Sequence, residues 1–127
     1  MGNKIDDLNV ITEKIIGCSI EVHRNLGPGL LESIYESALC YEFNENNMAY
    51  ENQVLVPIMY KGNRLGDYRL DLLVENEIIV EIKAVDRMEP VFEAQLLSYL
   101  RVTNKKLGLL INFNVPVIKN GIKRIIK

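Results

Sequence analysis

The sequence predicts an α/β (α+β) fold in which helices flank one mixed β-sheet, and two observations support this prediction. Apolar runs at residues 68–74 and 78–85 flank the polar triplet 75–77, as in a β-hairpin. Helical periodicity precedes and follows this hairpin, and the continuous apolar run at residues 107–113 is typical of a buried central strand. The expected order is α-α-β-β-β-α-β with a short C-terminal β addition.

Length and composition limit the class of protein. The 127 residues are 48% hydrophobic, so we expect a single domain over residues 1–127 with a real core. The formal net charge of −2 argues against strong non-specific nucleic-acid binding by the monomer. Cys18 and Cys40 lack metal-ligand spacing, so we expect reduced core thiols in a cytosolic, cytoplasmic protein. No stretch is long and apolar enough to span a membrane, and the first residues do not form a signal peptide.

The N-terminal part predicts two helices. Apolar residues recur at spacings of three and four from Leu8 to Val22, which indicates an amphipathic helix. This helix should end before residues 26–29, because Leu-Gly-Pro-Gly has the composition of a turn. A second helix is expected over about residues 30–44.

The strand predicted next, at residues 53–60, contains Pro57, which indicates an edge strand or a bulge. Gly62 and Asn63 should form a tight hairpin turn, with glycine supplying the positive φ. This turn leads into the hairpin of residues 68–85 described above.

The C-terminal part predicts one more helix and three short strands. The helix should begin near Pro90, which suits an early helical position, and run to about Thr103. After the strand at 107–113, residues 115–118 and 122–126 are expected to form a final hairpin around an Asn-Gly turn.

Three charged residues interrupt the apolar strands of the central hairpin. If residues 75–77 form the turn, Asp71 lies opposite Glu81, and Lys83 shares the face of Glu81. A two-residue turn would instead place the two acids on opposite faces. Charges within apolar strands cost free energy unless they are paired, and opposed carboxylates repel. A divalent cation such as Mg²⁺ would relieve this repulsion.

The alternative interpretation of this charged group is a surface salt-bridge cluster on a half-solvated sheet. The neighbouring apolar residues occur at both odd and even positions of the strands, so they point to both faces. This pattern favours a sheet that is covered on both faces. Such a sheet leaves little room for charges without a function.

Further candidate residues lie on the predicted helices. Glu32 opens the second helix, where the helix dipole alone also favours an acid, and Tyr35 and Glu36 share its face. Gln95 and Tyr99, four residues apart, share a face of the later helix. Gln95 could orient a water, bind the lysine or a phosphate, or be an ordinary boundary amide.

Residues 29–35 read Gly-Leu-Leu-Glu-Ser-Ile-Tyr, a Gly-x-x-Glu-x-x-Tyr signature. Together with Glu-Val-His-Arg at 21–24, Glu-Ile-Lys at 81–83 and the blocks at 95–100 and 108–113, it makes the chain resemble the GxxExxY proteins. That family is grouped with the PD-(D/E)xK nuclease superfamily. The resemblance implies a restriction-endonuclease-like core, α-β-β-β-α-β, with an extra N-terminal helix.

The resemblance also implies Mg²⁺-dependent hydrolysis of phosphodiester bonds in DNA, with Mn²⁺ as a substitute. Asp71 and Glu81 would bind the metal, Glu32 would complete the site, and the carbonyl of Ile82 would be an additional ligand. Lys83 would position the attacking water or help to deprotonate it.

The later helix supplies the remaining candidates. Gln95 and Tyr99 match a Gln-x-x-x-Tyr motif of related exonucleases and would support the lysine or contact phosphate. Positive charge for DNA would come from the basic residues Lys61, Arg64, Arg69 and Arg87. A homodimer would suit so small a nuclease, because one active site cuts one strand per encounter.

Two alternatives remain open at this point. The first is a non-catalytic module that binds nucleic acid or serves in protein assembly and retains the nuclease fold. The second is an interaction protein in which the charged group is a structural ion-pair network.

Overall fold

The computed structural model describes residues 4–127, with side chains from Asp7 onward. Its elements are α1 (Lys4–Leu26), α2 (Glu32–Glu45), β1 (Tyr50–Tyr60), β2 (Asn63–Val74), β3 (Ile78–Lys83), α3 (Pro90–Thr103), β4 (Leu107–Asn112), the 3₁₀ helix η1 (Ile118–Gly121) and β5 (Ile122–Ile126). The strands form one five-stranded sheet in the order β1-β2-β3-β4-β5. β3 and β4 run parallel, and the other neighbours run antiparallel. This mixed sheet flanked by helices confirms the fold class predicted from the sequence.

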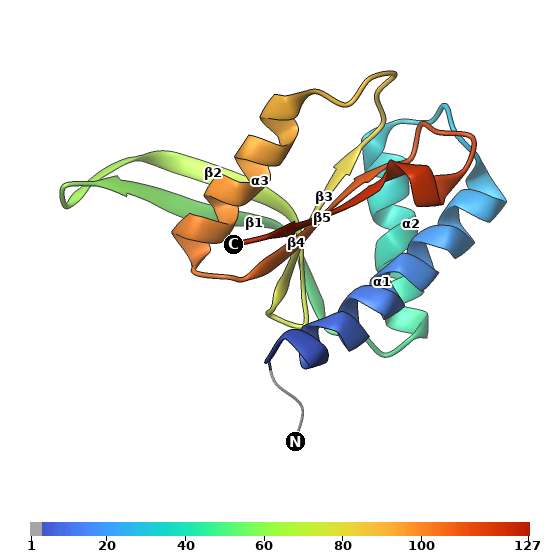
Figure 1. Cartoon of the computed structure of the whole chain (residues 1–127), viewed down its shortest axis with the longest axis horizontal. Coiled ribbons are helices and arrows are strands. Elements are labelled where there is room, and N and C mark those ends of the chain that lie inside the picture. The colour runs from blue at the N-terminus through green and yellow to red at the C-terminus, as the bar shows by residue number, and fades with distance from the viewer. Residues whose placement is uncertain (1–3) are drawn as a thin grey trace.

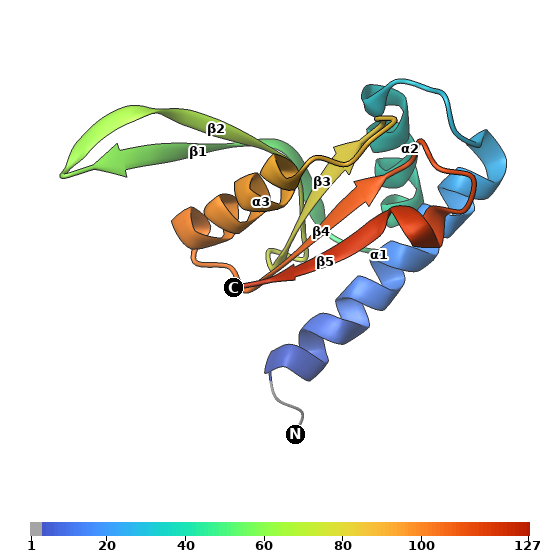
Figure 2. The same ribbon diagram turned by 45° about the horizontal axis from the view of Figure 1, so that its top comes forward.

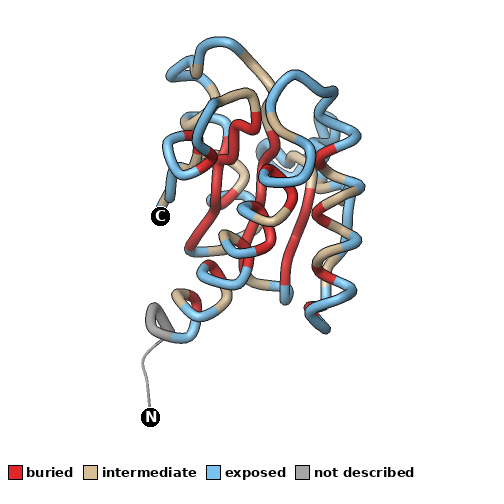
Figure 3. The backbone as a smooth tube through the Cα atoms, turned by 90° about the vertical axis from the view of Figure 1, so that its right-hand side faces the viewer, coloured by how far each residue is buried: buried red, intermediate tan, exposed pale blue. Residues whose placement is uncertain are grey.

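The helices cover the two faces of the sheet, with α1 and α2 on one side and α3 on the other (Figure 1). β3 and β4 lie in the middle and are buried on both faces, which explains their near-continuous apolar sequences. Ile78 and Val80 pack on the side of α1 and α2, and Ile79 packs on the side of α3. Figure 3 shows the buried residues concentrated along these strands. The centre of the sheet is therefore a rigid support for the ends of its strands.

β1 and β2 continue beyond the helices as a long hairpin, the β1–β2 arm (Figure 2). Tyr60 pairs with Asn63, so the turn residues are Lys61 and Gly62, both with positive φ, at 50° and 81°. The prediction that Asn63 belongs to the turn is wrong by one residue. A register shift between Ile58 and Met59 moves the turn, and a two-residue turn of this type needs positive φ at both central positions.

The connection between β4 and β5 corrects the predicted final hairpin. Residues 115–117 are not a strand, and β5 pairs antiparallel with β4 instead. The carbonyl of Val115 accepts a hydrogen bond from Nε2 of His23 at 2.7 Å, and Pro116 has no N–H to donate to a strand. Gly121 follows in η1, where a Cβ would lie 2.1 Å from the carbonyl oxygen of Asn112. Glycine at position 121 therefore permits the close approach between η1 and the end of β4 that precedes β5.

The central hairpin has the register predicted from a three-residue turn. Val74 lies opposite Ile78, and Glu75 and Asn76 of the turn have φ of 52° and 55°.

Over residues 4–127, no helix combines the length and apolar character needed to cross a membrane.

Candidate active site

The β2–β3 ladder stops where the two strands meet their acidic residues. The last regular pair is Leu72 with Val80, so Asp71 and Glu81 would form the next one. Instead, the main-chain N–H of Asp71 donates to Oε2 of Glu81 at 2.9 Å. The N–H of Ile82 donates to Oδ2 of Asp71 at 2.8 Å. The two carboxylates thus replace main-chain carbonyls as acceptors at the point where the strands separate.

The β1 side of Asp71 is irregular as well. Asn52 pairs with Leu72 and Val54 pairs with Leu70, but Gln53 and Asp71, between them, form no regular pair. Gln53 has φ 54°, in the left-handed region. Such a conformation costs a non-glycine residue about 1–2 kcal/mol.

Because of this irregularity, the residues of β2 on either side of Asp71 point to opposite faces of the sheet. Leu72 belongs to the core beneath α1 and α2, whereas Leu70 belongs to the core beneath α3. In a regular strand, residues two apart share a face. Asp71 therefore lies at the point where β2 changes face. Its carboxyl group can face α2 and still lie next to Glu81.

Asp71 lines a depression of about 400 Å³ beside α2. Its lining residues are Glu32, Ser33, Glu36, Gln53, Asp71 and Ile82. Glu36 accepts hydrogen bonds from Nε2 of Gln53 at 2.7 Å and from Nδ2 of Asn52 at 3.4 Å. Sequence reasoning did not assign Glu36 to the site, although its position one helical turn after Glu32 was a signal that could have found it.

Burial and repulsion shift the ionisation of both central acids. Burial and the neighbouring charge of Asp71 raise the pKa of Glu81 from its usual 4.5 to about 8. Burial also raises the pKa of Asp71, and the charges of Glu36 and Glu32 act in the same direction. A group that brings positive charge between the carboxylates would reverse both shifts.

Lys83 follows Glu81 on the same strand face, toward α3. Its Nζ lies 4.5 Å from the centroid of the Phe92 ring, a cation–π contact that sequence reasoning missed because Phe92 belongs to another element. Lys83 lowers the pKa of both acids, yet within residues 7–127 no carboxylate oxygen lies within 4.0 Å of its ammonium. The ammonium is thus close to the carboxylates without being neutralised by direct contact.

Asn112 of β4 fixes the backbone just beyond Lys83. Its side chain donates to the carbonyl of Val85 at 3.0 Å and accepts from the N–H of Val85 at 3.1 Å. The N–H of Phe113 donates to the carbonyl of Lys83 at 2.9 Å. These bonds hold the end of β3 rigidly against β4.

The two α3 candidates are placed differently. Tyr99 packs edge-on against Tyr68 with ring centroids 5.1 Å apart, and burial followed by the charge of Glu81 raises its pKa. Gln95 is exposed, and no described residue forms a hydrogen bond with its side chain. The structure brings Tyr99 close to the acids but does not join Gln95 to them.

The tyrosine of the Gly-x-x-Glu-x-x-Tyr signature is a core residue rather than part of the depression. Tyr35 is 0% exposed and stacks on Phe113 with ring centroids 4.6 Å apart. Its hydroxyl donates to the carbonyl of Gly27 at 2.6 Å and accepts from the N–H of Leu30 at 3.1 Å. Tyr35 therefore holds the loop that leads into Glu32.

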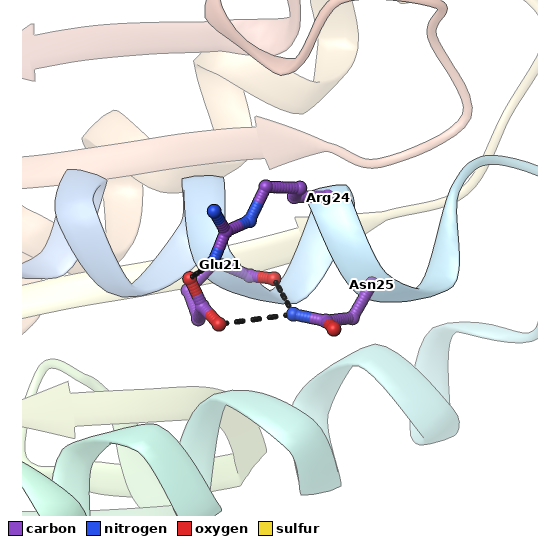
Figure 4. Close-up of polar contacts among 3 residues, drawn as sticks. All are labelled: Glu21, Arg24 and Asn25. Carbon is purple, nitrogen blue, oxygen red and sulfur yellow. Dashed lines mark hydrogen bonds and ion pairs between the residues drawn. The ribbon is translucent and has the colours of Figure 1, made fainter.

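A second depression, of about 370 Å³, lies between α1 and α2. Glu21 borders it and accepts hydrogen bonds from Arg24 and Asn25, its neighbours on the same helix (Figure 4). Contacts between residues three and four apart stabilise exposed helices by only about 0.2–0.5 kcal/mol each. This group is a local feature of α1 and lies apart from the central acids.

A family model described as the PD-(D/E)XK nuclease superfamily matches residues 9–125. The chain belongs to this superfamily. The searches of curated proteins and of solved structures returned no match. PD-(D/E)XK nucleases act on nucleic acid and generally use divalent metals.

The carboxylates of this PD-(D/E)XK domain suit a divalent metal chemically. In Asp71 and in Glu81, one carboxylate oxygen accepts a hydrogen bond from a main-chain N–H. No described group donates a hydrogen bond to the second oxygen of either carboxylate, so that oxygen is available to a metal. Within the described residues, no three His, Cys, Asp or Glu side chains stand close enough together to hold an ion. Mg²⁺ is typically held by one or two carboxylates, several waters and substrate phosphates, which agrees with a two-carboxylate site.

Proposed function

We propose that residues 1–127 form a single cytoplasmic nuclease domain of the GxxExxY family that hydrolyses phosphodiester bonds in DNA with Mg²⁺, or with Mn²⁺ as a substitute. The observation that supports this proposal best is the pair Asp71 and Glu81, two adjacent carboxylates at the point where β2 and β3 separate. Their raised pKa values indicate a site that favours a cation.

In the proposed site, Asp71 and Glu81 are the main metal ligands. Glu32 and the carbonyl of Ile82 are proposed to complete the set, since Glu32 and Ile82 line the same depression as Asp71. A bound divalent cation supplies Lewis-acid stabilisation of charge on the phosphate and lowers the pKa of a bound water. The chain's own contribution is to hold these oxygens at a rigid strand end.

Lys83 is proposed to position the attacking water or help to deprotonate it, or to stabilise negative charge as it develops on the phosphate. The Phe92 ring holds its ammonium without neutralising it, so the positive charge remains available to a phosphate oxygen. Tyr99, whose pKa is raised in part by the charge of Glu81, and Gln95, which is exposed on α3, are both proposed to support Lys83 or to contact phosphate.

DNA is the proposed substrate because of the β1–β2 arm. Lys61, Arg64 and Arg69 all lie on it, whereas Arg87 lies just before α3. Arg64 is paired with Asp67 at 2.5 Å, but Arg69 forms no ion pair with any described residue. A two-stranded ribbon can enter the major groove of duplex DNA, and the arm has this form. A homodimer would place two such sites on one duplex.

One observation favours the alternative of a non-catalytic nucleic-acid-binding module. The described residues provide two adjacent carboxylates but no group of three potential metal ligands. That alternative expects DNA binding that does not depend on metal and no cleavage.

A cleavage assay separates the two proposals. Supercoiled and linear DNA would be incubated with Mg²⁺ or Mn²⁺, and with EDTA as the metal-free control. The nuclease proposal predicts metal-dependent cleavage that Asp71→Asn abolishes and that Lys83→Ala reduces by about 10²-fold or more. Lys106→Ala, a surface control, should retain full cleavage. Full activity in Lys83→Ala would contradict the proposed mechanism.

A further inference from the structure

Gln53 is an unusual residue for the interior of a β-strand. Its φ of 54° lies in the left-handed region, which is rarely occupied by residues other than Gly, Asn and Asp. It lies directly across from Asp71, between the regular pairs Asn52–Leu72 and Val54–Leu70. Strained backbone conformations in proteins cluster at functional sites, so the strain at Gln53, in the middle of β1 and beside the candidate site, suggests a functional role.

The side chain of Gln53 reaches α2. Its Nε2 donates to Oε1 of Glu36 at 2.7 Å, and Nδ2 of Asn52 lies 3.4 Å from Oε2 of the same carboxylate. Two adjacent amides of β1 thus hold one acidic side chain in the depression that Asp71 also lines.

Glu36 is better placed than Glu32 to act on the central pair. The charge of Glu36 acts on both Asp71 and Glu81, whereas the charge of Glu32 acts on Asp71. Glu32 is exposed, and no described residue forms a hydrogen bond with its carboxylate. Glu36 is half-buried and is fixed in position by the amides.

We propose that Gln53 is a positioning residue that fixes Glu36 as a further acidic group of the cation site, beside the proposed ligands, where it acts on the cation through a bound water. This inference rests on the proposed metal-dependent function. Both oxygens of Glu36 already accept amide hydrogen bonds, which leaves them suited to a water rather than to direct coordination. Mg²⁺ keeps several waters in protein sites, and groups that bind those waters tune its affinity.

The test is calorimetric binding of Mn²⁺ alone, at fixed pH and ionic strength, together with thermal unfolding of each variant without metal. Gln53→Asn is the main variant, because asparagine tolerates left-handed φ but is too short to hold Glu36 in the same position. Gln53→Met is the second variant, because it removes the amide at similar length. Glu45→Gln is the control, because it removes an exposed negative charge from α2 outside the depression.

The inference predicts that both Gln53 variants and Glu36→Gln weaken Mn²⁺ binding by about tenfold, the size of other outer-sphere effects. The double variant Gln53→Asn with Glu36→Gln should bind no more weakly than Glu36→Gln, because Gln53 acts through Glu36. Glu45→Gln should bind as the wild type does.

Two results would overturn the inference while leaving the proposed metal site intact. One is wild-type affinity in the Gln53 and Glu36 variants, whatever their unfolding temperature; a lower unfolding temperature would then mean that the contact only joins α2 to β1. The other is tighter binding in the Gln53 variants, which would mean that Gln53 keeps Glu36 away from the cation. A wild-type protein that binds no Mn²⁺ would instead overturn the proposed metal site, and this inference with it.

Discussion

Asp71 and Glu81 lie opposite each other at the end of the β2–β3 ladder, and the carboxylate of Glu81 accepts the main-chain N–H of Asp71 at 2.9 Å. Asp71 in turn accepts the N–H of Ile82 at 2.8 Å. The main-chain N–H groups of Asp71 and Ile82 therefore both have an acceptor where the strands separate, although two negative charges are brought together. The fold holds the repelling pair in place, and the pair provides the cation affinity on which the proposed chemistry depends.

The raised pKa of Glu81 predicts an unusual dependence of stability on pH. Its folded pKa, about 8, lies above its usual 4.5, so the folded state holds a proton that the unfolded state has lost. The contribution to stability is complete below about pH 4.5 and is lost as pH rises through 8. The metal-free protein should lose on the order of a few kcal/mol over this range.

Denaturant unfolding at several pH values measures this loss, with Glu81→Gln as the comparison. The amide cannot titrate, so the variant should show a much flatter profile between pH 5 and 8. A wild-type profile equally flat over that range would show that Glu81 does not hold its proton in the folded protein.

Lys83→Ala should reduce cleavage by about 10²–10⁴-fold, the usual contribution of a positioned group that helps to transfer a proton. The fold should survive, because Lys83 is half-buried and lies at a strand end held by Asn112 and Phe113. Single-turnover cleavage and circular dichroism measure the two effects. Phe92→Leu should cause a smaller loss, because it removes the cation–π contact and leaves the ammonium.

Arg69→Ala should weaken DNA binding by removing one phosphate contact from the arm. The dependence of the logarithm of affinity on the logarithm of salt concentration should become shallower by about one unit. Titrations of duplex DNA from low to physiological salt, in Ca²⁺ or without metal to prevent cleavage, measure this slope. Lys106→Ala, on the turn after α3, should leave the slope unchanged, and an unchanged slope in Arg69→Ala would exclude the arm from the interface.

Tyr35→Phe should destabilise the fold without a direct effect on the metal ligands. The variant removes the hydroxyl that donates to Gly27 and leaves the N–H of Leu30 without its acceptor. The loss should be about 1–3 kcal/mol, the cost of breaking buried hydrogen bonds. Urea unfolding measures it. A loss of Mn²⁺ affinity with unchanged stability would assign the signature tyrosine to the site instead of the loop.

Local sequence determined the central hairpin well. The three-residue turn 75–77 was enough to place Asp71 next to Glu81, and the two-residue period of β3 was enough to place Lys83 on the face of Glu81, because these relationships depend only on neighbouring residues. The same period did not predict the change of face at Asp71, where Leu70 and Leu72 lie on opposite faces. The helices and the buried strand β4 were also predictable, because their apolar patterns reflect burial that the local sequence records.

Long-range contacts account for what sequence reasoning missed. Nothing near Gln53 indicates a left-handed residue, and its contact is with Glu36, a residue 17 positions earlier in another element. Phe92 reaches Lys83 from α3 in the same way. The predicted final hairpin is wrong because the carbonyl of Val115 binds His23, 92 residues earlier, instead of a strand partner.

The most direct test of the account is calorimetric titration of Mn²⁺ into the wild type and into Asp71→Asn, with Asp7→Asn as a control for loss of one negative charge. The account predicts that the wild type binds Mn²⁺ and releases protons as it does so, because Glu81 must ionise. Asp71→Asn should abolish binding and Asp7→Asn should not. Binding that survives Asp71→Asn unchanged, or no binding by the wild type at millimolar metal, would contradict the proposed metal site.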